Sequence, residues 1–180
     1  MFGKRGAAVT LGSLLLVGSS LVWAPMGRAG TGGHEGGFLC TGSSRSHYDP
    51  PLTFDPRLTR VHADVTYTSC AVGPGRTVPA TSSFDGLSPA ASCLTLSGGG
   101  GKETIEYADG RRSLIVYDSA TILRVAGVLS LVQSGRVTEG HGKGHPVRRA
   151  VTGPPRELLT GCLTSGLREG GNTVQLEVRP

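Results

Sequence analysis

Residues 59–69 alternate between apolar and polar side chains, and this alternation constrains the fold more than any other feature of the chain. One face carries Val61, Ala63, Val65 and Tyr67, and the other carries Arg60, His62, Asp64, Thr66 and Thr68. A period of two is typical of a β-strand with one face in a core and one in water, as in antiparallel sheets. We therefore expect a chain built on antiparallel β-structure.

Two strand pairs can be expected from the pattern around turn residues. Residues 38–48 and 58–70 are expected to form a hairpin centred near residue 53. Asp109-Gly110 stands between two strand-like runs, residues 103–108 and residues 111–117. This dipeptide predicts a type I′ hairpin turn, in which both central residues take a positive φ.

The most apolar stretch after the first thirty residues is Thr121 to Gln133. Both of its faces are largely apolar, so it is interpreted as one central strand, with a helix as the alternative. β-Branched residues and Gly127 count against the helix. Ser134-Gly135 is then expected to turn the chain.

The rest of the body is expected to add short elements. Strands are predicted near residues 81–84, 93–96, 147–151 and 173–178, and one short helix near 155–161, with prolines at its start and Gly161 at its end. Many short strands with frequent turn signals indicate an all-β fold, either an antiparallel β-sandwich or a small β-barrel. Residues 38–180 are expected to form this single β domain.

The first 29 residues have the three parts of a secretory signal peptide. Lys4 and Arg5 form a basic start, an apolar run follows, and small residues precede a predicted cleavage after Ala29. An uncleaved anchor helix is the alternative. The mature protein is expected to be secreted, to begin with a flexible Gly-rich leader over residues 30–37, and to meet the membrane only through the signal.

Cleavage would change the charge of the chain. It removes Lys4, Arg5 and Arg28 and no acid, which lowers the formal net charge from +5 to about +2. A nucleic-acid partner needs a clustered basic face, and we expect none here.

The four cysteines all follow the predicted cleavage site. An even number in an exported chain predicts two disulfides among Cys40, Cys70, Cys93 and Cys162. Zinc is the alternative, but its ligands usually come as close pairs. Three pairings are possible; the hairpin expected near residue 53 favours Cys40 with Cys70, which leaves Cys93 with Cys162.

No motif with catalytic or cofactor chemistry stands out. Gly98 to Lys102 lacks the Ser or Thr that a phosphate-binding loop needs after its lysine. His141 and His145 are separated by glycines, and Glu103 and Glu106 would point to opposite faces of a strand. No catalytic, cofactor or metal residue is therefore predicted, and the chain is not expected to be an enzyme.

Small exported β domains usually act through loops or an exposed sheet face. The loops expected here are 71–80, 97–102, 109–111 and 138–146. A basic surface patch is one candidate site, and its members would be Arg111, Arg112, Lys143, Arg148 and Arg149. It would face an anionic polymer of the cell envelope; ordinary solubilising charge is the alternative.

Several short segments together resemble known proteins. They are Cys40-Thr-Gly42, Pro51 to Pro56, Tyr67 to Cys70, Ser92-Cys93-Leu94, Glu103 to Gly110, Ser134-Gly-Arg136 and Gly161-Cys162-Leu163. This frame resembles a group of small secreted all-β proteins of actinomycetes, most of them uncharacterised. In that group the position of Tyr107 often holds Trp. The resemblance implies export and a β fold, and it supplies no catalytic residues.

A smaller segment, Ile115 to Asp118, resembles part of the secreted subtilisin-inhibitor family, although no cysteine lies beside Val116. The expected function is a non-enzymatic binding or structural module of the cell exterior, with an anionic envelope polymer or another exported protein as partner. A serine-peptidase inhibitor and an extracellular hydrolase are the alternatives.

Overall fold

The structure is a computed structural model that describes residues 37–97, 99–125, 128–153 and 161–180. Its strands are β1 (Phe38–Leu52), β2 (Arg57–Gly73), β3 (Arg76–Ala91), β4 (Leu96–Ser97), β5 (Gly101–Tyr107), β6 (Arg112–Val125), β7 (Val128–Gly140), β8 (Pro146–Thr152) and β9 (Leu167–Val178). The predicted signal peptide and nearly all of the predicted leader lie outside the described residues. So does the predicted helix, except Gly161, which begins a short helical turn.

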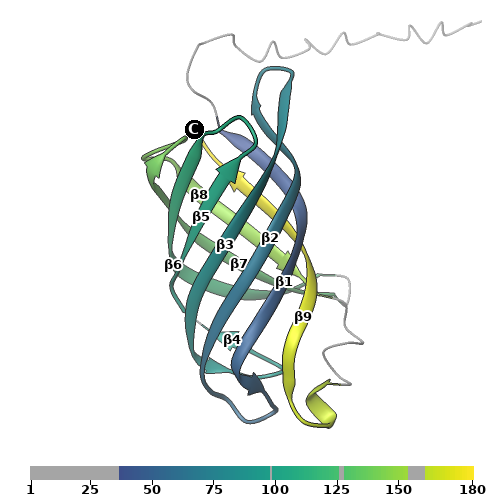
Figure 1. The fold of residues 1–180 in the computed structure, drawn as a ribbon. Coiled ribbons are helices and arrows are strands. Elements are labelled where there is room, and N and C mark those ends of the chain that lie inside the picture. Colours follow the sequence, from purple (N-terminus) through teal and green to yellow (C-terminus); the bar gives the residue numbers. More distant parts are fainter. Residues whose placement is uncertain (1–36, 98, 126–127, 154–160) are drawn as a thin grey trace, which may run out of the picture. The chain divides into compact units, whose positions relative to one another are not determined.

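Eight of these strands form a closed antiparallel barrel (Figure 1). Each long strand pairs with the next along the chain, β9 returns to pair with β1, and the two-residue β4 pairs with the end of β3. The prediction of an all-β fold with a small barrel is confirmed, and the alternative of a sandwich is wrong. Closure leaves none of the eight long strands as an open edge.

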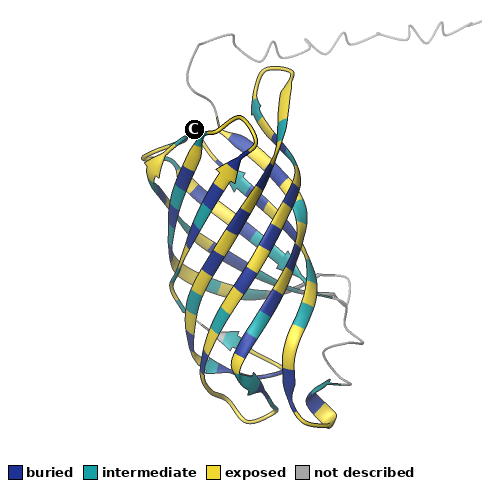
Figure 2. Cartoon of the chain, in the orientation of Figure 1, coloured by how far each residue is buried: buried dark blue, intermediate teal, exposed yellow. Residues whose placement is uncertain are grey.

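Along most of β2 and along β5, side chains alternate between the interior and the solvent (Figure 2). β1 pairs with β2 and β9 so that Phe38, Val178 and the β2–β3 turn lie at one end. Leu52, Leu96 and Leu167 lie at the other, which we call the β4 end. The half away from the β4 end is filled by aromatic and aliphatic side chains, among them Tyr67, Ile105, Tyr107, Ile115 and Leu176.

Both disulfides follow the favoured pairing. Cys40 and Cys70 lie opposite each other on β1 and β2, with their Cα atoms 4.0 Å apart. The expected hairpin is therefore confirmed. Cys93 joins Cys162, with Cα atoms 6.2 Å apart, and ties the segment after β3 to the segment before β9.

The interpretation of residues 121–133 as one strand is wrong. β6 ends at Val125 and β7 begins at Val128, and these two residues pair with each other. Ile122 on β6 and Leu131 on β7 pair with each other and both face the interior, although they are an odd number of residues apart, so the phase of the alternation changes between the two strands. Both faces of this run are largely apolar, so the sequence does not show the change. The turn expected at Ser134-Gly135 is absent, because Gly135 lies inside β7 opposite Tyr117. An added Cβ at Gly135 would lie 2.1 Å from the Val116 carbonyl oxygen.

The Asp109-Gly110 turn is present but differs from the expected type. The Gly110 N–H donates to the Tyr107 carbonyl over 2.9 Å, so Ala108 and Asp109 are the central residues. Gly110 follows them with φ +85°. The turn thus begins one residue earlier than a two-residue Asp-Gly turn would, although glycine still takes the left-handed position.

The connections are shorter than expected. β2 continues to Gly73 and β3 begins at Arg76, so most of residues 71–80 are strand. Residues 141–145 join β7 to β8. In the described part of the chain, no helix has the length and apolar character needed to span a bilayer.

A candidate ligand cavity inside the barrel

A buried carboxylate lies at the middle of the barrel. Glu103 on β5 is fully buried. Its Oε1 accepts hydrogen bonds from the Tyr67 hydroxyl at 2.8 Å and the Ser82 hydroxyl at 2.5 Å, and its Oε2 accepts one from the Tyr117 hydroxyl at 2.5 Å. Three hydroxyl donors satisfy the oxygens of this buried carboxylate.

Arg149 on β8 is the countercharge and is itself only 2% exposed. Its Nε lies 3.5 Å from Glu103 Oε2, and its Nη1 donates to Gln133 Oε1 over 2.8 Å. Neither Nε nor Nη2 donates a hydrogen bond to any residue that the structure describes. A buried donor without an acceptor costs about 1–3 kcal/mol.

The Arg149 guanidinium also lies over an aromatic ring, with its Cζ 4.7 Å from the centroid of Phe84. Two glycines give the ring this position. Gly86 follows Phe84 on the same face of β3, and Gly101 is its partner on β5. An added Cβ would come within 2.7 Å of the ring at Gly86 and 2.5 Å at Gly101. The absence of both side chains lets the ring occupy the space where they would be.

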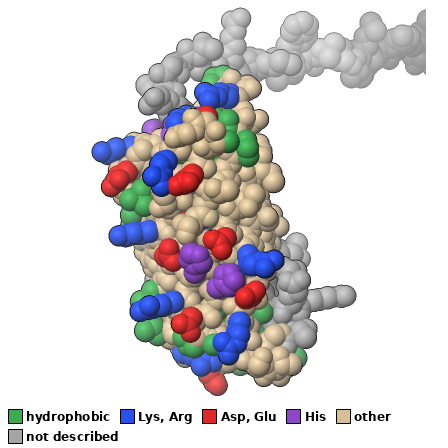
Figure 3. Space-filling view, in the orientation of Figure 1, with side chains coloured by type: hydrophobic (Ala, Val, Ile, Leu, Met, Phe, Trp, Pro, Cys, Tyr) green, Lys and Arg blue, Asp and Glu red, His purple; other side chains and the backbone are tan. Residues whose placement is uncertain are grey.

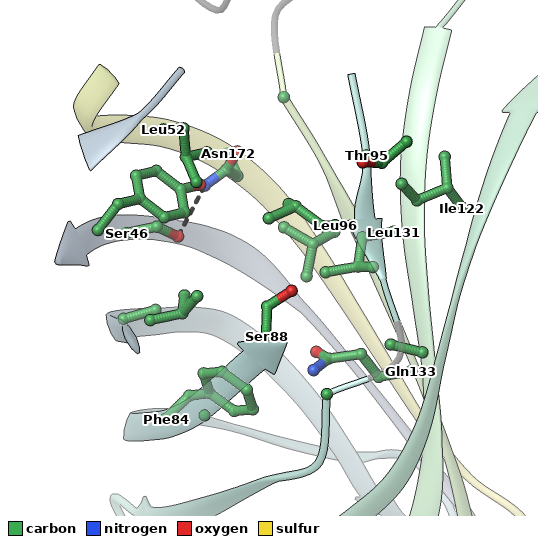
Figure 4. Close-up of a pocket in the computed structure, with 18 of the residues that line it drawn as sticks. Ser46, Leu52, Phe84, Ser88, Thr95, Leu96, Ile122, Leu131, Gln133 and Asn172 are labelled. Atoms are coloured by element: carbon green, nitrogen blue, oxygen red, sulfur yellow. Dashed lines mark hydrogen bonds between the residues drawn. The ribbon is translucent and has the colours of Figure 1, made fainter. Parts of the chain in front are cut away.

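Between this charged layer and the β4 end the barrel is hollow. A cavity of about 90 Å³ opens there. Its walls are mainly carbon, from Leu52, Val61, Phe84, Leu96, Ile122 and Leu131. Arg149 and Gln133 line it too. Figure 4 shows the Gln133 amide and the Ser88 hydroxyl turned toward the same space.

A second polar group lies on the opposite wall. Asn172 on β9 donates from Nδ2 to the Ser46 hydroxyl on β1 over 3.0 Å (Figure 4). Tyr48 lines the cavity beside them, and burial raises the pKa of its hydroxyl. The cavity is therefore apolar along its length, with polar groups at separate places on its wall, as small-molecule sites commonly are.

The segment around β4 covers this end of the cavity. Ser92, Cys93, Thr95 and Leu96 all line the cavity. The Ser92 hydroxyl accepts hydrogen bonds from the N–H groups of Leu94 and Thr95, and the Cys93 N–H donates to the Thr53 carbonyl over 2.8 Å. We call residues 92–97 the cover. The Cys93–Cys162 disulfide ties the cover to the segment before β9.

The candidate basic patch is divided by the structure. Arg111, Arg112 and Lys143 border one hollow at the end opposite β4. Arg111 pairs with Asp109 at 2.7 Å and Arg112 with Glu106 at 2.5 Å, so acids offset two of the three charges. The hydrogen bond from Arg111 lowers the pKa of Asp109 to about 2.

The other two members lie elsewhere. Arg148 is exposed on the outside of β8 opposite Glu177. Arg149 is inside the barrel, so its assignment to a surface patch is wrong. Val147, Arg149 and Val151 share one face of β8, and this alternation is the signal by which the sequence places Arg149 inside. The same reasoning applies to Glu103, Ile105 and Tyr107 on β5.

The histidines occupy other parts of the barrel. His141 stacks on Phe38 with ring centroids 5.0 Å apart, and His145 Nδ1 lies 2.9 Å from the Arg179 carbonyl oxygen. His47 Nδ1 lies 3.3 Å from Glu169 Oε1 and His62 Nδ1 lies 2.8 Å from Asp85 Oδ1, and all four side chains are at least partly exposed. Figure 3 shows histidine side chains with acidic and basic side chains around them on one face of the barrel. Across the described ranges, no three His, Cys, Asp or Glu side chains converge as metal ligands would.

No family model matches the chain, and neither a curated protein nor a solved structure shows significant similarity to it.

Proposed function

We propose that the mature protein is a secreted, non-enzymatic binding module that holds one small, mainly apolar molecule in the cavity at the β4 end. The observation that carries this proposal is a mainly carbon-lined cavity of about 90 Å³, bordered by a buried guanidinium with two nitrogens that donate no hydrogen bond to a described residue. An eight-stranded barrel is just wide enough to be filled by side chains or to hold one small ligand. Here side chains fill one half, and the other half keeps a cavity of about 90 Å³ beside a second, smaller cluster of buried apolar side chains.

Two further features support this role. The two disulfides fit an oxidising compartment. Among the described residues that line the cavity there are serines but no histidine. A serine nucleophile needs a base within hydrogen-bond reach, so the cavity favours binding over hydrolysis.

Native mass spectrometry of the protein recovered from culture medium tests the proposal. We expect cleavage after Ala29, two disulfides, and a small adduct that is lost when the protein is unfolded. The variant Ala63→Leu adds a larger side chain to the cavity wall and should lose the adduct. Ala71→Leu, at an exposed position of the same strand, should retain it.

A bare mass for the wild-type protein, together with no uptake of small apolar probes, would contradict the proposal. An adduct that survives Ala63→Leu would place the ligand elsewhere.

A further inference from the structure

One part of the cavity wall is polar, and the hydrogen-bond donors there indicate the class of ligand. Two of the three guanidinium nitrogens of Arg149 donate no hydrogen bond to any described residue, although the side chain is almost fully buried and lines the cavity. A molecule in the cavity that carries an acceptor can satisfy them. An occupant with carbon atoms alone leaves them unsatisfied.

The charge of the site decides which acceptor fits. Glu103 carries the negative charge that Arg149 needs, and it already accepts three hydroxyl hydrogen bonds. The buried pair is therefore neutral as a unit. A ligand carboxylate would add a second buried negative charge to a site with one buried positive charge, and an uncompensated charge is costly in a dry interior.

We infer that Arg149 receives a neutral oxygen acceptor, a carbonyl group, from a small molecule whose apolar remainder lies against Leu96, Ile122 and Leu131. This inference rests on the proposed function and adds the ligand class to it. An apolar cavity of about 150 Å³ takes up benzene. The cavity here is smaller, at about 90 Å³, so it suits a molecule with fewer non-hydrogen atoms than benzene.

Four probes with five non-hydrogen atoms each separate the possibilities: 2-butanone, pentane, propanoate and butylamine. Each is titrated into the full mature protein, and binding is followed through the ¹⁵N–¹H signal of Arg149 Nε and the backbone signals of the cover. We expect 2-butanone to bind at least 10-fold more tightly than the other three. Only 2-butanone should shift the Arg149 signal.

Removing the charged pair tests the role of Arg149 without leaving a buried ion alone. The double variant Glu103→Gln/Arg149→Met replaces both charges, a change that buried pairs often tolerate. It should still bind pentane, and the advantage of 2-butanone should disappear. The matched control is Glu106→Gln/Arg112→Met, which removes an exposed ion pair between the neighbouring strands β5 and β6 and should keep the wild-type preference.

Each other result contradicts a definite part of the inference. Equal binding of 2-butanone and pentane, or strongest binding of propanoate or butylamine, would overturn the carbonyl assignment and leave the proposed binding function intact. A preference that persists in the double variant would overturn the role of Arg149. If no probe binds and the recovered protein carries no adduct, both the inference and the proposed function are wrong.

Discussion

Glu103 and Arg149 are the residues on which the interior of the barrel depends. Each is a charged residue on an otherwise apolar face of its strand, and each is buried. The carboxylate is held by hydroxyls from β2, β3 and β6, and the guanidinium by β7 and the Phe84 ring. Long-range neighbours from four strands thus make two buried charges tolerable.

Glu103→Gln should destabilise the protein by about 3–5 kcal/mol, because it leaves the Arg149 charge buried without its partner. The control is Glu106→Gln, at an exposed position on the outer face of the same strand. It should cost at most about 1 kcal/mol. Urea unfolding of the two variants measures the difference. Equal losses would mean that the buried pair contributes no more than the surface pair.

His62 is the residue whose protonation should respond most directly to one neighbour. The hydrogen bond to Asp85 at 2.8 Å raises the pKa of His62, and Asp64 at 3.5 Å adds a smaller effect. The charged form is therefore favoured by folding. Its small stabilising contribution is present below pH of about 6.5 and is lost as the pH rises through the folded pKa.

An NMR titration of His62 checks this order of effects. Asp85→Asn should lower the pKa of His62 more than Asp64→Asn does. A larger change with Asp64→Asn would show that the imidazole bonds mainly to the other carboxylate.

At the scale of elements, two features shape the cavity at the β4 end of the barrel. The glycines of β3 and β5 let Phe84 lie where their side chains would be, and the cover closes the β4 end through hydrogen bonds and one disulfide. The cavity therefore results from what these segments leave empty. A change in either feature should alter the cavity without abolishing the barrel.

Gly101→Ala should destabilise the protein by about 1–3 kcal/mol, because the added Cβ would lie 2.5 Å from the Phe84 ring and force it to move. Gly73→Ala is the control, since no atom lies within 4 Å of its added Cβ and its φ is not positive. It should change stability by less than about 0.5 kcal/mol. Thermal unfolding distinguishes the two, and a neutral Gly101→Ala would mean that the ring moves at no cost.

The two disulfides should differ in what they hold in place. Cys40–Cys70 joins strands that already pair along their length, whereas Cys93–Cys162 holds the cover. Replacing both Cys93 and Cys162 with Ser should increase amide hydrogen exchange over residues 92–97. The matching change at Cys40 and Cys70 should leave that exchange unaltered, and an equal increase in both variants would show that the cover depends on overall stability alone.

At the scale of the whole molecule, the barrel shields all four tyrosines from water. Burial raises the pKa of Tyr48, raises that of Tyr107 to about 12, and raises those of Tyr67 and Tyr117 well above 10. The unfolded chain releases these protons near pH 10. The folded state therefore binds more protons above that pH, and stability falls as the pH rises beyond about 10.

Ultraviolet absorbance of tyrosinate should show no ionisation in the native protein near pH 10. The four residues should ionise together, at the higher pH where circular dichroism reports unfolding. A separate step near pH 10 would mean that at least one tyrosine is exposed to solvent.

The sequence by itself determined the class of the fold, the first hairpin and, through that hairpin, the disulfide pairing, since these depend on alternation and on neighbours along the chain. It also held the signals that place Glu103 and Arg149 on inward faces. It did not distinguish a barrel from a sandwich, because that choice depends on whether β9 pairs with β1 across nearly the whole chain. Nor did it reveal the reversal between β6 and β7, since both faces of that run are largely apolar and a change in the phase of the alternation cannot be seen there. The cavity, too, was decided only by the tertiary structure, because an empty space is defined by side chains from many strands that meet only when the barrel closes.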